Sequence, residues 1–344
     1  MRVYSAAEAV SPAVQRTQRF LFRPFEWGSY LKLAAIAAVS EGTLLSFNFS
    51  TGSSGSGNST GEATALHLTA GWIAAIALGA ALSLLVGIYL FYLITRLRFA
   101  LFHCLVYQVK EIGPGWRRYR AQAMRLFKLN LLVWLGLAIV GALAVLPFAP
   151  TLLKLVEAHR DGEPMDVGGM IVLFLLLGLI VFVLAIVFVA ADAVLHDFIL
   201  PRMALEDASA GDAWRGARAL IDAEPGSVCF YLFLRMVLPL FAMIGLFLVA
   251  LIPTLVVVGV LGMGAMEFRS LLEDATGVGE ALRVSLAILF GLVGLSFCAL
   301  LAVGLGGPLG ICIRNYALLF YGGRYAALGD LLSPPPAAVL PSLE

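Results

Sequence analysis

Ionisable residues inside long apolar runs are the first candidates for chemistry in this chain. Glu41 lies about eleven residues into one such run, and Asp192 and His196 lie one helical turn apart in another. Charged groups are costly within a membrane, so each of these residues is a functional candidate. Glu41 could bind a cation, relay a proton or pair with a basic ligand. Alternatively, it lies near the external surface, where a carboxylate costs little.

The residue types around Asp192 and His196 include those that bind metals. His103 and Cys104 lie at the equivalent end of another apolar run, and His, Cys and Asp side chains are common zinc ligands. Their spacing matches no known ligand signature, and polar residues are expected where a span meets the cytoplasm. We therefore predict no metal and no cofactor.

Three cationic residues lie in or beside the apolar runs. Arg314 follows the last run and could contact lipid headgroups or the region of Asp192 and Asp197. Lys32 and Arg235 lie near the predicted cytoplasmic ends of their spans. Long cationic side chains there are expected to reach toward the headgroups.

The stretch GLGGPLG, from Gly304 to Gly310, is expected to interrupt the end of the last run. Pro308 removes a backbone donor, and the glycines lower helicity. One interpretation is a broken helix that lines a transport site. The other is a kink at the membrane exit, after which residues 311–320 run along the inner surface.

Motifs for enzymatic chemistry are absent from the sequence. It contains no Walker A or HExxH pattern, and no GxGxxG that opens a helix after a strand. Catalysis at a membrane surface usually needs a cluster of acids, bases or metal ligands, and no convincing cluster is present. We therefore predict that the protein is not an enzyme.

The composition requires lipid as the solvent for most of the chain. Hydrophobic residues make up 61% of it and charged residues 13%, whereas a soluble domain is nearer half and a quarter. The net charge of +1 gives no field that would favour nucleic acid. We predict an all-α polytopic membrane protein in a single domain, residues 1–344. Six spans are expected, at about 30–49, 67–97, 130–153, 169–195, 230–262 and 282–303.

The distribution of Lys and Arg predicts the orientation of these spans. The connector 96–128 holds eight Lys and Arg, whereas the connector 48–67 holds none. Over the whole chain the predicted cytoplasmic segments hold seventeen and the external ones four, so both termini, including the tail 304–344, are expected in the cytoplasm. An alternative for the first span is a cleaved signal peptide with residues 31–39 as its apolar core.

Each outgoing span follows a basic segment that is expected to form an amphipathic helix on the cytoplasmic surface, the first within residues 1–29. Trp and Arg recur in these segments, and the last two match at an offset of 98 residues. Such side chains suit the headgroup region, either as a lipid-binding or regulatory surface or as simple anchors. The candidate residues are Trp27, Trp116, Arg117, Arg120, Trp214, Arg215 and Arg218. The predicted fold is three pseudo-repeated transmembrane hairpins, each preceded by an interfacial helix. The helices of the second and fourth spans are expected to continue into the cytoplasm through residues 99–108 and 197–205, and Gly113-Pro114-Gly115 is expected to turn the first extension back. Ser209 is the expected N-cap of the helix that contains Trp214.

The segment from Leu200 to Leu220 resembles a pattern in a loose group of prokaryotic membrane proteins. Its Leu205-Glu206, Ser209, Ala213 and Ala217 occupy the motif, although the usual second small polar residue is Ala217 here. The group includes six-span families and the membrane domain of some glycerophosphodiester phosphodiesterases. The resemblance implies a six-span protein of the cytoplasmic membrane without catalytic residues, because the chemistry of those phosphodiesterases belongs to a separate soluble domain.

Two function classes remain from the sequence. The first is a non-catalytic scaffold or accessory component that binds lipid headgroups, a membrane partner protein or a second copy of itself. The second is a transporter or carrier of a lipid or small amphiphile, which would use Glu41 and the Gly304–Gly310 stretch. The basic interfacial segments are the strongest polar signal, and they favour the first class.

Overall fold

The computed structural model describes residues 3–41, 70–161, 167–271 and 278–332, which form helices and turns with no strand among them. The chain divides into two compact units. Unit 1 comprises Met1–Arg16, Tyr119–Leu240 and Ile313–Glu344, and unit 2 comprises Thr17–Arg118 and Phe241–Cys312. Because of this division, α11 and α12 each contribute one end to each unit.

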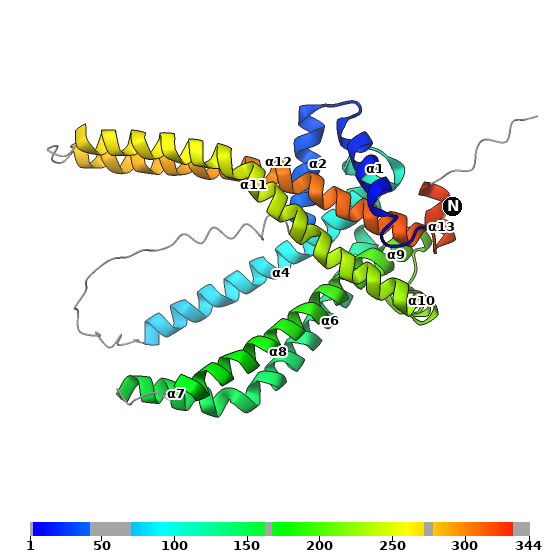
Figure 1. The fold of residues 1–344 in the computed structure, drawn as a ribbon, viewed down its shortest axis with the longest axis horizontal. Coiled ribbons are helices and arrows are strands. Elements are labelled where there is room, and N and C mark those ends of the chain that lie inside the picture. The colour runs from blue at the N-terminus through cyan, green and yellow to red at the C-terminus, as the bar shows by residue number, and fades with distance from the viewer. Residues whose placement is uncertain (1–2, 42–69, 162–166, 272–277, 333–344) are drawn as a thin grey trace, which may run out of the picture. The chain divides into compact units, whose positions relative to one another are not determined.

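Helices account for nearly all of the described residues (Figure 1). In chain order they are α1 (Val10–Phe22), α2 (Trp27–Ser40), α4 (Ala70–Tyr107), α5 (Gly113–Arg118), α6 (Arg120–Val145), η1 (Leu146–Phe148), α7 (Ala149–Asp161), α8 (Val167–Val194), η2 (Leu195–Ile199), α9 (Leu200–Glu206), α10 (Ala210–Ala223), α11 (Pro225–Leu271), α12 (Val278–Gly322) and α13 (Ala326–Leu332).

Five of these helices are long and apolar enough to cross a membrane, within the residues that the structure describes. They coincide with the predicted spans 67–97, from Ala70 onward, 130–153, 169–195, 230–262 and 282–303. In the span 130–153, α6 ends at Val145, and η1 and α7 complete it. The most apolar windows of the five helices are almost entirely exposed, so these side chains need an apolar solvent. The chain is therefore a multi-pass helical membrane protein.

The remaining predicted span, 30–49, coincides only in part with a described helix. α2 has 14 residues, which is a length of about 21 Å and less than the hydrocarbon thickness of about 30 Å. The rest of this predicted span, apart from Glu41, and the predicted external connector 48–67 lie outside the described residues.

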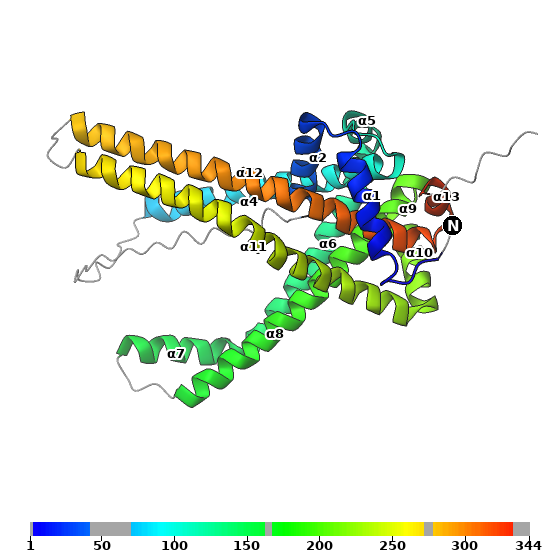
Figure 2. The same cartoon turned by 45° about the horizontal axis from the view of Figure 1, so that its top comes forward.

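Unit 1 is built on a pair of helices with a polar and aromatic core at one end. α6 and α8 lie side by side in both views (Figures 1 and 2). The C-terminal end of α8 continues without a break through η2 into α9. α10 packs against η2 and α9. The prediction that the helix of the fourth span continues through residues 197–205 is thus confirmed.

Unit 2 contains a close helix contact that explains the glycines near Pro308. A Cβ on Gly307 would lie 2.4 Å from the Cα of Ala34 in α2, and one on Gly310 would lie 3.1 Å from the carbonyl oxygen of Ala37. The predicted interruption is wrong, because α12 continues through Pro308 without a break. Small residues here allow two helices to approach each other closely.

Tyr30 supplies the hydrogen bond that Pro308 cannot make. Proline has no N–H, so the carbonyl of Gly304, four residues earlier, loses its helical donor. The hydroxyl of Tyr30 donates to that carbonyl oxygen at 2.7 Å. A buried backbone carbonyl in an apolar region needs such a partner, so α2 stabilises α12 at this point.

Two further local predictions are corrected. Residues 313–320 do not run along a surface, because they continue α12 and are buried in the core of unit 1. The turn after α4 was expected at Gly113-Pro114-Gly115, but these residues begin α5. The chain turns earlier, at Gln108, whose φ of 54° is left-handed. The Val109 N–H closes the helix end by donating to the carbonyl of Cys104.

Candidate functional site

A buried carboxylate lies at the centre of the polar interior of unit 1. Asp197, in η2, accepts hydrogen bonds from the Tyr231 hydroxyl at 2.7 Å and the Arg235 Nε at 3.2 Å, both on one oxygen. Arg314 donates to the other oxygen at 2.9 Å. We call these four residues the Asp197 cluster. Because they come from η2, α11 and α12, the cluster joins three segments that are distant in sequence.

The Asp197 cluster is shielded from solvent by its own residues and by aromatic rings. The Asp197 side chain is fully buried, that of Arg314 is 1% exposed and that of Arg235 is 14% exposed. The Tyr231 ring stacks on Phe320 with centroids 4.3 Å apart. Phe198 and Tyr316 also contact the Tyr231 ring. In such surroundings each charge depends on its partners, since breaking a buried ion pair costs about 3–5 kcal/mol.

A widened helical turn presents Asp197 to these partners. η2 is a π-helical segment of five residues, Leu195–Ile199, and α9 follows it directly with Pro201 near its start. Proline cannot donate to the carbonyl four residues earlier, which here is that of Asp197, so the regular bonding pattern cannot continue. π-helical turns within α-helices are frequent at functional sites, and this one carries the buried charge.

The side chains of Asp192, near the end of α8, and His196, in η2, are in contact as predicted from their spacing of one helical turn. The Nδ1 atom of His196 lies 3.0 Å from the Asp192 carboxylate, and its Nε2 atom lies 3.5 Å from the amide nitrogen of Asn130. The His196 side chain is 2% exposed, so it is part of the interior and not of the surface. This arrangement links α6 to the α8–η2 helix through a histidine.

The placement of Arg314 and Arg235 bears on two predictions. Arg314 was expected to contact headgroups or the region of Asp192 and Asp197, and the structure places it on Asp197. Arg235 was expected to reach toward the headgroups, but that prediction is wrong because its guanidinium bonds to Asp197 inside unit 1. Opposite charges in or just beyond three different spans were the sequence signal for this cluster, which was recognised only in part.

Trp116 is held by a cationic partner that the sequence analysis missed. Its carbonyl oxygen accepts hydrogen bonds from Nε and Nη2 of Arg96, at 3.1 Å and 3.0 Å. The Arg96 guanidinium also lies 4.0 Å from the centroid of the Trp116 indole. Arg117 on α5 and Arg120 at the start of α6 are exposed, and neither forms an ion pair with another described residue.

The equivalent segment on α10 is exposed but nearly neutral in charge. Trp214 is 47% exposed, and Arg215 and Arg218 are more exposed still. Arg215 pairs with Asp212, and Arg218 lies 3.5 Å from Asp222. The two segments that match at an offset of 98 residues therefore share a tryptophan and exposed arginines, but not their net charge.

The start of α10 confirms the predicted helix cap. The Ser209 hydroxyl accepts a hydrogen bond from the Asp212 N–H at 3.2 Å, as expected for an N-cap. The hydroxyl also donates to the Asp212 carboxylate, and this bond, followed by the charge of Arg215, lowers the pKa of Asp212.

The other two predicted residues lie in unit 2. Trp27, at the start of α2, is 70% exposed and belongs to a group of aromatic rings with Phe25 and Tyr30. Glu41 follows the last residue of α2 and is half-buried. A Cβ on Gly310 would lie 3.4 Å from the Cβ of Glu41. Glu41 therefore lies beside the α2–α12 contact.

Metal-binding geometry is absent from the described part of the chain, where no three His, Cys, Asp or Glu side chains form a group that could hold an ion. The Asp197 cluster is instead a buried polar interior in which one carboxylate binds two guanidinium groups. A family of unknown function, DUF7544, has a model that matches residues 4–331, so the chain belongs to that family. No curated protein and no solved structure matches the chain.

Proposed function

We propose that this protein is a non-catalytic scaffold or accessory component of a prokaryotic cytoplasmic membrane that binds anionic lipid headgroups. A membrane partner protein or a second copy of the chain would then assemble on the same lipid-facing helices. The resemblance to the membrane domain of glycerophosphodiester phosphodiesterases stays a prediction, and it supports the same absence of catalytic residues.

The proposed topology has six spans, with both termini in the cytoplasm. Three hairpins would each follow an interfacial helix, and the sequence match between the Trp116 and Trp214 segments supports this repeat. Their burial patterns also agree. At the offset of 98 residues, Gly115 matches Ala213 and Tyr119 matches Ala217, and all four are buried.

One observation carries the lipid-binding proposal: exposed arginines without an acidic partner among the described residues lie next to the ends of long apolar helices. Arg117 precedes α6 and Arg120 begins it, and α6 belongs to a candidate span. Lys and Arg near an anionic membrane surface each contribute about 1 kcal/mol to binding. Arg215 and Arg218, which have acidic partners, are expected to contribute less.

Native mass spectrometry tests this proposal on the full chain. The protein would be equilibrated in micelles that contain equal amounts of phosphatidylglycerol and phosphatidylcholine, and the retained lipids counted. We expect the wild type to retain phosphatidylglycerol preferentially. Replacing Arg117 and Arg120 by Gln should reduce this preference more than replacing Arg215 and Arg218 by Gln. Equal retention of the two lipids by the wild type would refute the proposal.

A second candidate function, a carrier of a lipid or small amphiphile, is favoured by the Asp197 cluster. Buried ionisable groups within membrane segments often mark transport pathways. The sequence predicted a broken helix at Pro308 as a second argument for a carrier, but α12 is continuous at this residue, so this argument is weaker. A stoichiometric small molecule that survives purification of the wild type and is lost from the Glu41→Gln or Asp197→Asn variant would favour the carrier.

A further inference from the structure

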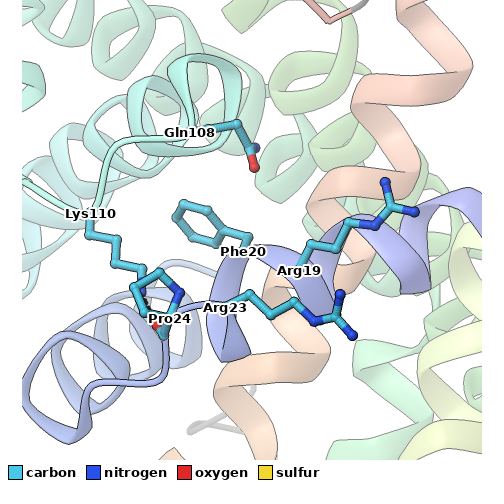
Figure 3. A pocket seen from close by; sticks show the side chains of 6 residues that line it. All are labelled: Arg19, Phe20, Arg23, Pro24, Gln108 and Lys110. Carbon is cyan, nitrogen blue, oxygen red and sulfur yellow. Dashed lines mark hydrogen bonds between the residues drawn. The ribbon is translucent and has the colours of Figure 1, made fainter.

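A cationic pocket lies in unit 2, between the end of α1 and the residues that follow α4 (Figure 3). Its volume is about 540 Å³, which is within the range of small-ligand sites. None of the described residues that line it is acidic. The lining residues are Arg19, Phe20, Arg23, Pro24, Gln108 and Lys110.

Local contacts hold the walls of this pocket in place. Phe20 is 4% exposed, so it anchors the end of α1 in the protein interior. The Lys110 ammonium donates a hydrogen bond to the carbonyl oxygen of Pro24, which ties the two walls together. The Gln108 amide donates to the carbonyl oxygen of Leu105 at 2.7 Å, so this side chain is also fixed.

Gln108 occupies a backbone position at which glycine would be more favourable. Its φ of 54° is in the left-handed region, which costs an L-residue roughly 1 kcal/mol or more relative to glycine. Strained residues of this kind cluster at binding sites, where the side chain has a use. Here the side chain lies on the pocket.

The charges of the pocket call for an anion. Arg19 and Arg23 are four residues apart and extend in the same direction in Figure 3, and like charges at this spacing repel each other. Guanidinium groups bind phosphate oxygens in pairs, so Arg19 and Arg23 are the donors for the anion. The Lys110 ammonium lies at Pro24, on the other side of Phe20 from the two guanidinium groups, and adds to the positive charge of the pocket (Figure 3). The volume also exceeds that of a phosphate ion, and Phe20 and Pro24 leave an apolar wall for a carbon skeleton.

The residues next to the pocket favour a ligand at the membrane surface. Phe22, Phe25 and Trp27 are each at least 42% exposed and follow the pocket directly in the chain. Their rings contact one another, with centroids 5.9 Å apart for Phe22 and Phe25 and 4.9 Å for Phe25 and Trp27. Exposed aromatic groups of this kind belong at the headgroup level of a bilayer.

We propose that this pocket binds a phosphomonoester group, and that a lipid with such a headgroup, of the phosphatidic acid type, is its ligand. The lipid source rests on the proposed function, whereas the phosphomonoester chemistry does not. A soluble phosphomonoester is the other source of the same chemistry. A phosphodiester headgroup carries less charge and fewer free oxygens, so it binds more weakly.

Two measurements on the full-length protein in micelles test the pocket. The first counts retained phosphatidic acid against phosphatidylglycerol by native mass spectrometry. The second titrates glycerol 3-phosphate by calorimetry. Arg23→Gln should weaken binding of the phosphomonoester by about tenfold or more, because a charge-assisted pair is lost. Lys128→Gln removes one exposed charge from α6 and should leave binding unchanged.

Gln108→Gly separates binding from folding. It should preserve or raise the thermal stability, because glycine suits the left-handed backbone, and it should still weaken binding. A stable Gln108→Gly variant that binds like the wild type, together with an Arg23→Gln variant that also does so, would overturn the proposal.

The outcomes also distinguish the pocket proposal from the proposal that Arg117 and Arg120 bind anionic lipid headgroups. Preferential retention of phosphatidic acid that is lost in Arg23→Gln supports the lipid ligand. Binding of glycerol 3-phosphate without any lipid preference supports the pocket but assigns it the soluble source. Equal retention of phosphatidic acid and phosphatidylglycerol, sensitive to Arg117 and Arg120 alone, with no binding of glycerol 3-phosphate, refutes the pocket and leaves the general lipid-binding proposal intact.

Discussion

Asp197 is the residue on which the interior of unit 1 depends most. Its carboxylate is bonded to two guanidinium groups and one hydroxyl, from α11 and α12. Both of its oxygens have partners, and no water can replace them because the side chain is fully buried. A buried pair of this kind contributes little net stability relative to apolar packing, but its partial removal is costly.

Asp197→Asn should therefore destabilise the protein by about 3–5 kcal/mol, because two guanidinium groups lose their counter-charge. The measurement is the thermal unfolding of purified protein in detergent, followed by tryptophan fluorescence. Asp212→Asn is the matched control, since Asp212 also pairs with an arginine but is exposed, and it should unfold like the wild type. If both variants unfolded alike, the Asp197 cluster would have no structural role.

Sequence reasoning at the residue scale succeeded where the partners were local. Ser209 was predicted to cap α10, and it does so through a residue three positions away. Arg314 was placed near Asp197 as one of two options. Tyr231 and Arg235 were missed as partners of Asp197, because they are 34 and 38 residues away and only helix packing brings them together.

The contact between α2 and α12 is the clearest determinant at the scale of the helices. Gly307 approaches the backbone of Ala34 so closely that no side chain fits between them. The same stretch contains Gly304, which has open space around it. These two glycines therefore have different roles, although they lie three residues apart in one sequence motif.

Gly307→Ala should destabilise the protein by about 1–3 kcal/mol, because a Cβ at this position meets backbone atoms that cannot easily move. Gly304→Ala should be neutral or stabilising by up to about 1 kcal/mol, since alanine favours a helix and meets nothing. Thermal unfolding midpoints of the two variants provide the comparison. Equal midpoints would show that close packing at Gly307 is not required.

Tyr30 and Pro308 should be energetically coupled. Tyr30→Phe removes the donor to the Gly304 carbonyl and should cost about 1 kcal/mol in the wild-type background. Pro308→Ala restores the backbone N–H that serves this carbonyl, so the cost of Tyr30→Phe should fall in that background. A double-mutant cycle on unfolding midpoints measures the coupling. Equal costs in both backgrounds would contradict this account of Tyr30.

At the scale of the whole molecule, the long apolar helices require a membrane around them. The most apolar windows of α4, α6, α8, α11 and α12 are almost entirely exposed. Helices such as α11, with 47 residues and a length of about 70 Å, also exceed the hydrocarbon thickness of about 30 Å. Part of such a helix therefore extends beyond the hydrocarbon region.

Accessibility labelling tests the proposed orientation. A cysteine introduced by Ser56→Cys in the predicted external connector should react with a membrane-impermeant maleimide in intact cells. One introduced by Asp330→Cys, in α13, should react only after the cells are opened. The chain without either substitution controls for its four native cysteines. Labelling of Asp330→Cys in intact cells would refute a cytoplasmic C-terminus.

The sequence alone determined the class of this protein and the positions of its five longest apolar helices. Hydropathy and helix length are properties of one segment, so the spans 67–97 and 230–262 could be recognised without knowledge of their neighbours. The cap at Ser209 belongs with these, because both partners lie in the same turn. The Lys and Arg distribution supplied an orientation, which stays a prediction.

Only the tertiary structure decided which segments contact one another. The GLGGPLG stretch was interpreted as an interruption because its low helicity is visible in sequence, whereas the α2 helix that stabilises it is not. The pocket was likewise invisible, since Lys110 lies 86 residues from Pro24, to which it bonds. Most partners of Asp197 were likewise not visible in the sequence. A charge can be located in the sequence, but its burial and its partners depend on how distant helices pack.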